Sequence, residues 1–181
     1  LAALVFSCQS FLEIKPKSQS IAVDNNDLNK ALYSTASDVE SALAGVYADF
    51  RNEYFELDYF VNGDAQSDDA YAGADNPNNF QIDDYNIDAT NKNVSRDWAY
   101  LYGTIGKTNR VINNVDSVTD PELTDARKKQ IIAEASFIRA FCYFQAVQLW
   151  GDAPLQLKEV KTISAQVLPD IYPILFPPRA A

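Results

Sequence analysis

The sequence predicts an all-α fold of helical hairpins that stack as in an α-solenoid, with a long irregular loop between the first and second main helices. Three stretches place apolar residues at every third or fourth position, which is the spacing of one helix face. The last two stretches are only a few residues apart, so they must lie antiparallel. Residues 62–93, between the first and second stretches, are rich in Asn, Asp and Gly and lack this spacing.

Composition excludes several classes of protein. Of the 181 residues, 47% are hydrophobic and 22% are charged, which is typical of one globular unit that buries a core. The net charge of -10 and the lack of a basic run exclude nucleic acid as an expected partner. The sequence has no His and only two Cys, so we predict no metal site and no cofactor.

The first eight residues, LAALVFSC, are typical of the end of a secretory signal with a bacterial lipoprotein cleavage site. We interpret residues 1–7 as a remnant of the signal peptide, Cys8 as the lipidation site and residues 8–26 as a polar, lipid-anchored tether. Acyl chains on Cys8 and on the new amino terminus would hold the protein in a membrane. The alternative is a free Cys near a chain end.

The first main helix is expected to begin at a capping box, in which Ser37 accepts from a backbone N–H and Glu40 reaches back to the cap. It continues to about Arg51, and a weaker helical pattern precedes it at residues 27–33. Its apolar stripe consists of Val39, Ala42, Leu43, Val46, Tyr47 and Phe50.

The loop at residues 62–93 holds the candidate ligand-binding residues. They are Tyr71, Asn78, Phe80 and Tyr85. Aromatic rings among amides suit a carbohydrate, because a ring packs on the C–H face of a sugar while amides bond its hydroxyls. The Asp clusters lack the alternate spacing and closing Glu of a calcium loop. Paired acids such as Asp68 and Asp69 could in principle serve as the two carboxylates of a glycosidase. The side chains of residues adjacent in sequence point in different directions, however, which argues against this role.

The second main helix is expected to be capped by Ser95 and to run to about Val115. Asn109 falls on its apolar face, where a buried amide needs hydrogen-bond partners. The other residues of this face are Trp98, Leu101, Tyr102, Ile105, Ile112 and Val115.

The third main helix is expected to open with Asp120 and Pro121 and to end at about Trp150, before Gly151. One apolar stripe is formed by Ile131, Ala135, Ile138, Cys142, Ala146 and Leu149, and an adjacent stripe by Phe137, Phe141 and Phe144. Together they cover more than half of the circumference, so this helix needs neighbours on two sides. Within the first stripe, Cys142 is predicted to be a core residue and not a nucleophile.

Polar and aromatic residues of the last two helices are assigned structural roles. They are Trp98, Asn109, Glu134, Arg139, Trp150 and Asp152. Glu134 and Arg139 are five residues apart, so they cannot pair along one helix face. Arg139 is expected to bond a loop carboxylate or carbonyl, and Asp64 is one candidate. The two Trp residues are expected to be core anchors.

A hairpin that is apolar on two faces is the unit of tetratricopeptide-like repeats, which bury these faces by stacking. Trp98 and Leu101 keep the first spacing of the 34-residue repeat. Tyr102 stands where the strict pattern has Gly, and Ile105 where it has Tyr. The sequence therefore predicts a tetratricopeptide-like relative of that repeat, and an incomplete one.

Several motifs follow one another along the chain. They are Cys8 with Phe11-Leu12-Glu13, Ala42-Leu43-Ala44-Gly45-Val46-Tyr47, Gly63-Asp64, Asp68-Asp69-Ala70, Trp98 with Leu101-Tyr102 and Asn109, and EASFIRAFCYFQAVQLWGDAPL at residues 134–155. In type and order they resemble the SusD/RagB family of outer-membrane nutrient-binding lipoproteins. The resemblance implies tetratricopeptide-like helices that pack against a SusC-like, TonB-dependent transporter. It also implies a lipoprotein on the surface of the cell outer membrane that captures an oligosaccharide or, less favourably, a peptide. Such a protein is not an enzyme.

The resemblance covers residues 8 to about 157, and we expect residues 27–157 to form the SusD-like helical domain. Residues 158–181 instead contain four prolines in ten residues and are expected to be a truncation or frameshift product. The main hypothesis is therefore the N-terminal part of a nutrient-binding lipoprotein. The alternative is a helical-repeat scaffold that binds proteins, and a hydrolase that uses loop carboxylates is third.

Overall fold

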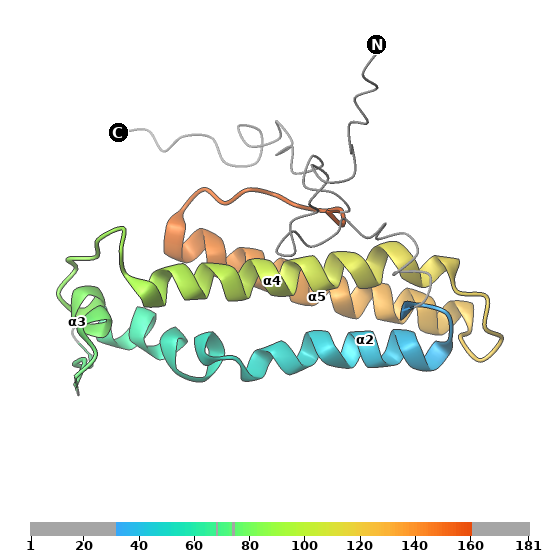
Figure 1. Ribbon diagram of the computed structural model, residues 1–181, viewed down its shortest axis with the longest axis horizontal. Coiled ribbons are helices and arrows are strands. Elements are labelled where there is room, and N and C mark those ends of the chain that lie inside the picture. The colour runs from blue at the N-terminus through green and yellow to red at the C-terminus, as the bar shows by residue number, and fades with distance from the viewer. Residues whose placement is uncertain (1–31, 68, 74, 161–181) are drawn as a thin grey trace, which may run out of the picture.

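The computed structural model describes residues 32–67, 69–73 and 75–160, and this part of the chain is helical without a β-strand, as predicted. Three helices lie side by side, with a short fourth one at one end (Figure 1). They are α2 (Ala36–Ala48), α3 (Pro77–Asp83), α4 (Lys92–Asn114) and α5 (Asp125–Trp150). No helix among the described residues is both long and apolar enough to cross a bilayer.

The predictions for both chain ends lie outside the described residues. They concern the signal remnant, the lipidation of Cys8, the tether at residues 8–26, most of the weak helix at residues 27–33 and most of the tail at residues 158–181.

Helix α2 begins two residues earlier than predicted. The Thr35 hydroxyl accepts from Asp38 N at 3.2 Å, and the Asp38 carboxylate accepts from Thr35 N at 2.8 Å. The capping box therefore consists of Thr35 and Asp38, and the predicted one at Ser37 and Glu40 is wrong. Glu40 instead binds Arg127 of α5, with Nε to Oε1 at 2.6 Å.

The helical path does not stop near Arg51 but continues through three short segments. These are the 3-10 helix η2 (Asp49–Arg51) and the π-helices η3 (Tyr54–Asp58) and η4 (Val61–Ala65). The wide turns close with bonds from Tyr59 N to Tyr54 O and from Gln66 N to Val61 O. A pattern of every third or fourth residue does not detect such turns, because a π-helix has a longer period.

The predicted irregular loop at residues 62–93 is therefore shorter than expected. Asn76 caps α3 by accepting from Asn78 N at 3.0 Å, and Pro77 occupies the first turn. Asn91 caps α4 by accepting from Val94 N at 3.1 Å, so the predicted cap at Ser95 is wrong. Both errors arise because an Asn-rich segment offers side chains that cap helices as well as form loops.

Helices α4 and α5 form the predicted antiparallel hairpin, joined through the 3-10 helix η5 (Val115–Ser117) (Figure 1). Thr124 caps α5 by accepting from Arg127 N at 3.2 Å, so the predicted start at Asp120 is wrong. The Asp120 carboxylate instead accepts from Ala36 N at 2.8 Å and ties the hairpin turn to the first residue of α2.

The core lies between α2, α4 and α5, and the first predicted stripe of α5 is buried in it. Its buried members are Ile131, Ala135, Ile138, Cys142 and Ala146. Burial raises the pKa of the Cys142 thiol to about 12, as expected for an unreactive core residue. The second stripe is mostly uncovered within the described residues, since Phe137 is 70% and Phe144 58% exposed. Phe141 packs against Phe50 with ring centroids 5.9 Å apart.

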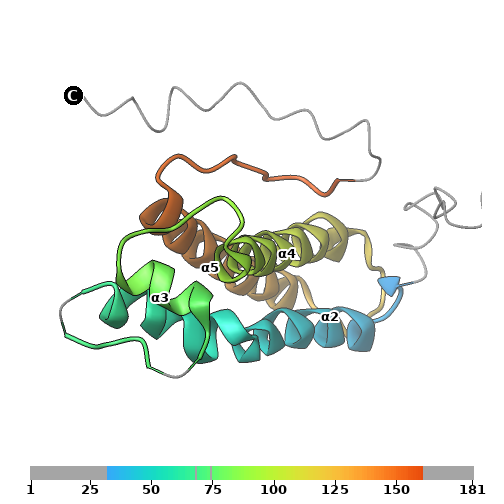
Figure 2. The same cartoon turned by 60° about the vertical axis from the view of Figure 1, so that its left-hand side comes forward.

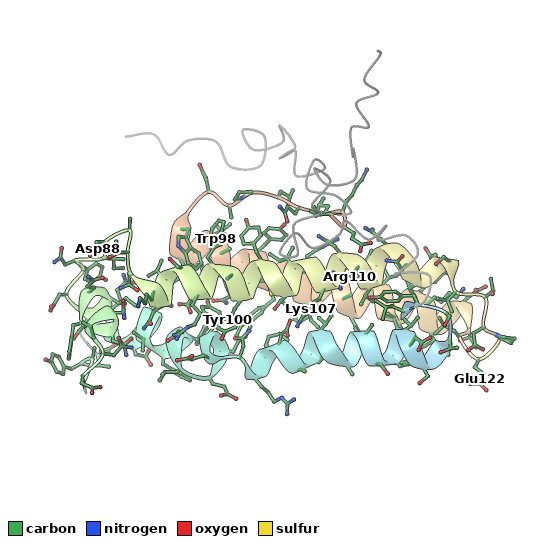
Figure 3. The ribbon with its side chains drawn as sticks, in the orientation of Figure 1. Asp88, Trp98, Tyr100, Lys107, Arg110 and Glu122 are labelled. Carbon is green, nitrogen blue, oxygen red and sulfur yellow. The ribbon has the colours of Figure 1, made fainter. Side chains whose placement is uncertain are left out.

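Helix α5 ends at Trp150, as predicted, because Gly151 adopts a φ of 75°. The chain then reverses, and residues 152–159, here called the return segment, run back over α4 and α5 (Figures 1 and 2). Trp98 lies on this side of α4 (Figure 3), edge-on to Trp150 at 5.2 Å and stacked on Tyr102 at 4.4 Å.

Candidate functional site

A hollow of about 370 Å³ opens where η3 and η4 meet the C-terminal half of α5. It combines aromatic rings with amide side chains and one carboxylate. Its lining residues are Tyr54, Tyr59, Phe60, Asn62, Gly63, Asp64, Gln66, Gln145, Gln148 and Leu149. We refer to this feature as the hollow.

The rim of the hollow presents two aromatic rings to solvent. Tyr59 is 45% and Phe60 55% exposed, and their rings stand perpendicular with centroids 5.9 Å apart. Tyr54 is buried, and its ring packs edge-on against that of Tyr59 with centroids 6.3 Å apart, so it helps to hold the Tyr59 ring in place. Exposed rings of this kind can pack on the C–H face of a sugar.

Two of the amides are held in place by buried partners. Tyr54 Oη donates to Gln145 Oε1 at 3.0 Å, and Asn62 Nδ2 donates to Asp97 Oδ2 at 2.9 Å. These bonds leave the Gln145 amide nitrogen and the Asn62 carbonyl oxygen available to a ligand. Gln148 and the Asp64 carboxylate add hydrogen-bonding groups to the lining of the hollow. The set suits a neutral ligand with many hydroxyl groups.

Next to the hollow, the structure buries two acids, Asp58 of η3 and Asp97 of α4, which are 1% and 0% exposed. Arg96 Nη2 donates to Asp58 Oδ2 at 2.5 Å, and Arg96 Nη1 lies 3.0 Å from Glu53 Oε2. Burial and a hydrogen bond with Asp58 raise the pKa of the Asp97 carboxyl to about 8.

The candidate ligand residues predicted from sequence do not line the hollow. Tyr71 and Tyr85 project into solvent, at 79% and 72% exposure. Asn78 and Phe80 belong to α3, and the Asn78 side chain accepts from Lys92 N at 3.1 Å, so it joins α3 to α4.

Sequence reasoning missed the hollow, although part of its signal was present. Residues 53–64, EYFELDYFVNGD, mix four aromatics, including the two at the rim, with amide and acid groups where the predicted loop begins. Gln145 and Gln148 belong to α5, near the other end of the described chain, and no motif in the sequence singles them out. Only the fold brings the two halves together.

The residues given structural roles gather mainly at the return segment. Asn109 Nδ2 donates to the carbonyl of Gln156 at 2.9 Å and its Oδ1 accepts from Arg139 at 2.7 Å. Arg139 also donates to the Leu157 carbonyl at 3.3 Å. Its predicted carboxylate partner, Asp64, lines the hollow instead, so only the prediction of a carbonyl partner is confirmed.

The remaining two of these residues lie elsewhere. Glu134 accepts from Tyr47 Oη at 3.0 Å and from Arg127 at 2.9 Å, which joins α5 to α2. Glu134 forms its ion pair with Arg127 and not with Arg139, as predicted. Asp152 is exposed directly after the end of α5.

A second hollow, of about 440 Å³, lies between α2 and α4 beside Leu32. Two cations of α4 line it (Figure 3), but Lys107 Nζ is already 2.5 Å from Asp49 and Arg110 Nε 3.3 Å from Glu159. Its surface is mainly apolar, so it lacks the mixture of rings and amides found at the first hollow. Within the described ranges, no three acid or Cys side chains come together as a metal site.

A family model named SusD-like and described as "Starch-binding associating with outer membrane" matches residues 10–167. The SusD-like protein P25 of Formosa agariphila is 30% identical over an alignment of 172 residues, and the match covers 87% of this chain and 31% of that protein. A SusD-like protein of Bacteroides ovatus is 27% identical over an alignment of 169 residues, and the match covers 92% of this chain and 29% of that protein. This chain thus spans less than a third of the length of either relative. No solved structure matches it significantly.

Proposed function

Because this chain belongs to the SusD-like family, whose proteins associate with the outer membrane, we propose that it is the N-terminal part of an oligosaccharide-binding lipoprotein. Proteins of this family bind ligands and are not enzymes, and we assign no catalytic role to the acids of this chain. The protein would capture a neutral oligosaccharide and deliver it to a TonB-dependent transporter of the SusC-like type.

The hollow is the observation that supports this proposal most directly. Tyr59 and Phe60 would pack against sugar rings, while Gln145, Gln148 and Asn62 would bond hydroxyl groups. All of these residues lie within the part of the chain that the family model matches. A peptide is the less favoured ligand, because the hollow has one carboxylate and no cation among its lining residues.

The membrane anchor and the hairpin repeat are further parts of the proposal. Cys8 would carry the acyl chains, and residues 8–26 would act as the tether. The α4–α5 hairpin would be one tetratricopeptide-like unit of a longer stack. The exposed Phe137 and Phe144 on α5 support this idea, since a further helix could cover them.

The binding proposal can be tested by isothermal titration calorimetry with a linear α-glucan such as maltoheptaose and, separately, with a mixture of short peptides. The double variant Tyr59→Ala, Phe60→Ala should weaken glucan binding by at least about tenfold, because it removes both stacking surfaces. Tyr71→Ala is the matched control, since Tyr71 is an exposed aromatic outside the hollow.

Equal losses in the double variant and in Tyr71→Ala would contradict the placement of the site in the hollow. A protein scaffold is the second candidate function, and the exposed Phe137 and Phe144 favour it. A scaffold would show heat of binding with neither glucan nor peptide, so the same titration distinguishes the two functions.

A further inference from the structure

The two buried acids beside the hollow, Asp58 and Asp97, lie where three elements meet. Asp58 comes from η3 and Asp97 from α4, and Asn62 of η4 donates to Asp97 Oδ2 at 2.9 Å. We call Asp58 and Asp97 the carboxyl pair. Both side chains are excluded from solvent, so their charges and hydrogen bonds must be satisfied inside the protein.

Two buried oxygens of the carboxyl pair lack a hydrogen-bond donor. Asp58 Oδ2 accepts from Arg96 and Asp97 Oδ2 from Asn62, whereas the Oδ1 atom of each acid is buried and has no hydrogen-bond partner among the described residues. The two carboxyl groups interact, since Asp58 is one of the groups that raise the pKa of Asp97. An ionised carboxylate can only accept, so a hydrogen bond between the two acids requires a proton on one of them.

The charges around the pair lead to the same result. Arg96 is the one cation that contacts the cluster in the described part of the chain, and it pairs with Asp58 and with the more exposed Glu53. Tyr54 of η3 also interacts with both acids, and burial raises its pKa, so it stays neutral. The single charge of Arg96 also reaches Asp97, so one cation is shared among three acids. Two ionised acids in contact at this depth would repel each other strongly.

The carboxyl pair is connected to the hollow through two residues that line it. Asn62 bonds Asp97 directly. Tyr54 is the first residue of η3, the π-helix that ends at Asp58, and it donates to Gln145 on the other side of the hollow. A second negative charge at the pair would push η3 and η4 away from α4 and displace both amides from their positions.

We propose that Asp58 and Asp97 form a buried proton-binding site, and that the proton held there keeps the hollow in its binding shape. The effect on ligand rests on the proposed function of the hollow, whereas the effect on folding does not. The native state holds a proton that the unfolded chain releases near the ordinary Asp value of 3.8. The free energy of unfolding should therefore fall as pH rises from that value to about 8, and then level off.

The test compares denaturant unfolding midpoints of the 181-residue chain and of Asp97→Asn between about pH 5 and about pH 9. Asn keeps the shape of Asp97 and cannot ionise. The wild-type midpoint should fall with pH, while the midpoint of Asp97→Asn should change much less and exceed the wild-type value at the upper end. Asp58→Asn should lower the midpoint at every pH, because it removes the negative charge that pairs with Arg96.

Infrared spectroscopy of the wild-type protein keeps the proposal testable if a variant fails to fold. A band of a protonated carboxyl group should be present at about pH 6 and disappear by about pH 10, with the fold retained. Absence of this band at the lower pH, or equal pH dependence in wild type and Asp97→Asn, would overturn the proposal.

Glucan titrations at the same pH values test the coupling to the hollow. Affinity should decrease as the proton is lost in wild type and stay constant in Asp97→Asn. Absence of binding at every pH would refute the proposed ligand but not the proton site. Binding in wild type that does not change with pH, while the unfolding midpoints do, would refute the coupling.

Discussion

At the scale of single residues, Asn109 fixes the course of the chain after α5. Its amide nitrogen donates to the carbonyls of Gln156 and Lys158, and its oxygen accepts from Arg139. The sequence predicts a buried amide at this position, because it interrupts an apolar stripe. Its partners could not be predicted, since backbone carbonyls of an irregular segment have no sequence signature.

Replacement of Asn109 by Ala should lower the free energy of unfolding by about 1–3 kcal/mol, because Arg139 and the carbonyls of the return segment lose a buried partner. Denaturant unfolding measures the effect. Asn113→Ala is the matched control, since Asn113 is an exposed Asn of the same helix. Equal effects of the two substitutions would show that Asn109 does not hold the return segment.

At the scale of elements, the sequence predicted the helices better than their ends. The apolar spacing located α2, α4 and α5, and Gly151 marked the end of α5. Each predicted N-terminus was shifted, because several Ser, Thr, Asp and Asn residues compete for the cap. Which of them caps depends on the backbone around it, as Thr35 shows at α2.

Gly151→Ala and Gly103→Ala should have opposite effects on stability. Gly151 has a φ of 75° and a ψ of -118°, a conformation that an L-residue adopts only with strain, so this change should cost about 1–3 kcal/mol. Gly103 lies in the interior of α4 with open space at its Cβ position, so Ala there should stabilise by about 0.5–1 kcal/mol. Thermal unfolding of both variants checks this. A neutral Gly151→Ala would contradict the described end of α5.

The π-helices η3 and η4 explain why the candidate site could not be predicted as a unit. Tyr59 and Phe60 are aromatics near amides in the sequence, but the wide turns on either side of them have no simple periodicity. Gln145 belongs to a helix read as apolar on two sides. The site therefore depends on a contact between α5 and a segment whose helical form was not expected.

At the scale of the whole molecule, the described residues leave part of α5 uncovered. Ile138 is fully buried, whereas Phe137 and Phe144 are mostly exposed among the described residues. The chain spans 31% of its relative from Formosa agariphila, so a longer protein of this family has further chain that could cover such a surface.

The double variant Phe137→Gln, Phe144→Gln should change the free energy of unfolding by less than about 1 kcal/mol, because both rings are already in water. It should also reduce self-association in sedimentation velocity experiments. Ile138→Ala is the comparison and should cost about 2–5 kcal/mol, as a fully buried residue does. A loss in the double variant as large as that of Ile138→Ala would mean that the Phe side chains are buried.

We propose that the hollow between η3, η4 and α5 is where this SusD-like chain contacts an oligosaccharide. Nuclear magnetic resonance of the labelled protein, titrated with maltoheptaose, tests it most directly. We expect the signals of Tyr59, Phe60, Gln145 and Gln148 to shift together and saturably. Shifts confined to Tyr71, Asn78, Phe80 and Tyr85, or no shifts in the hollow at saturating glucan, would contradict it.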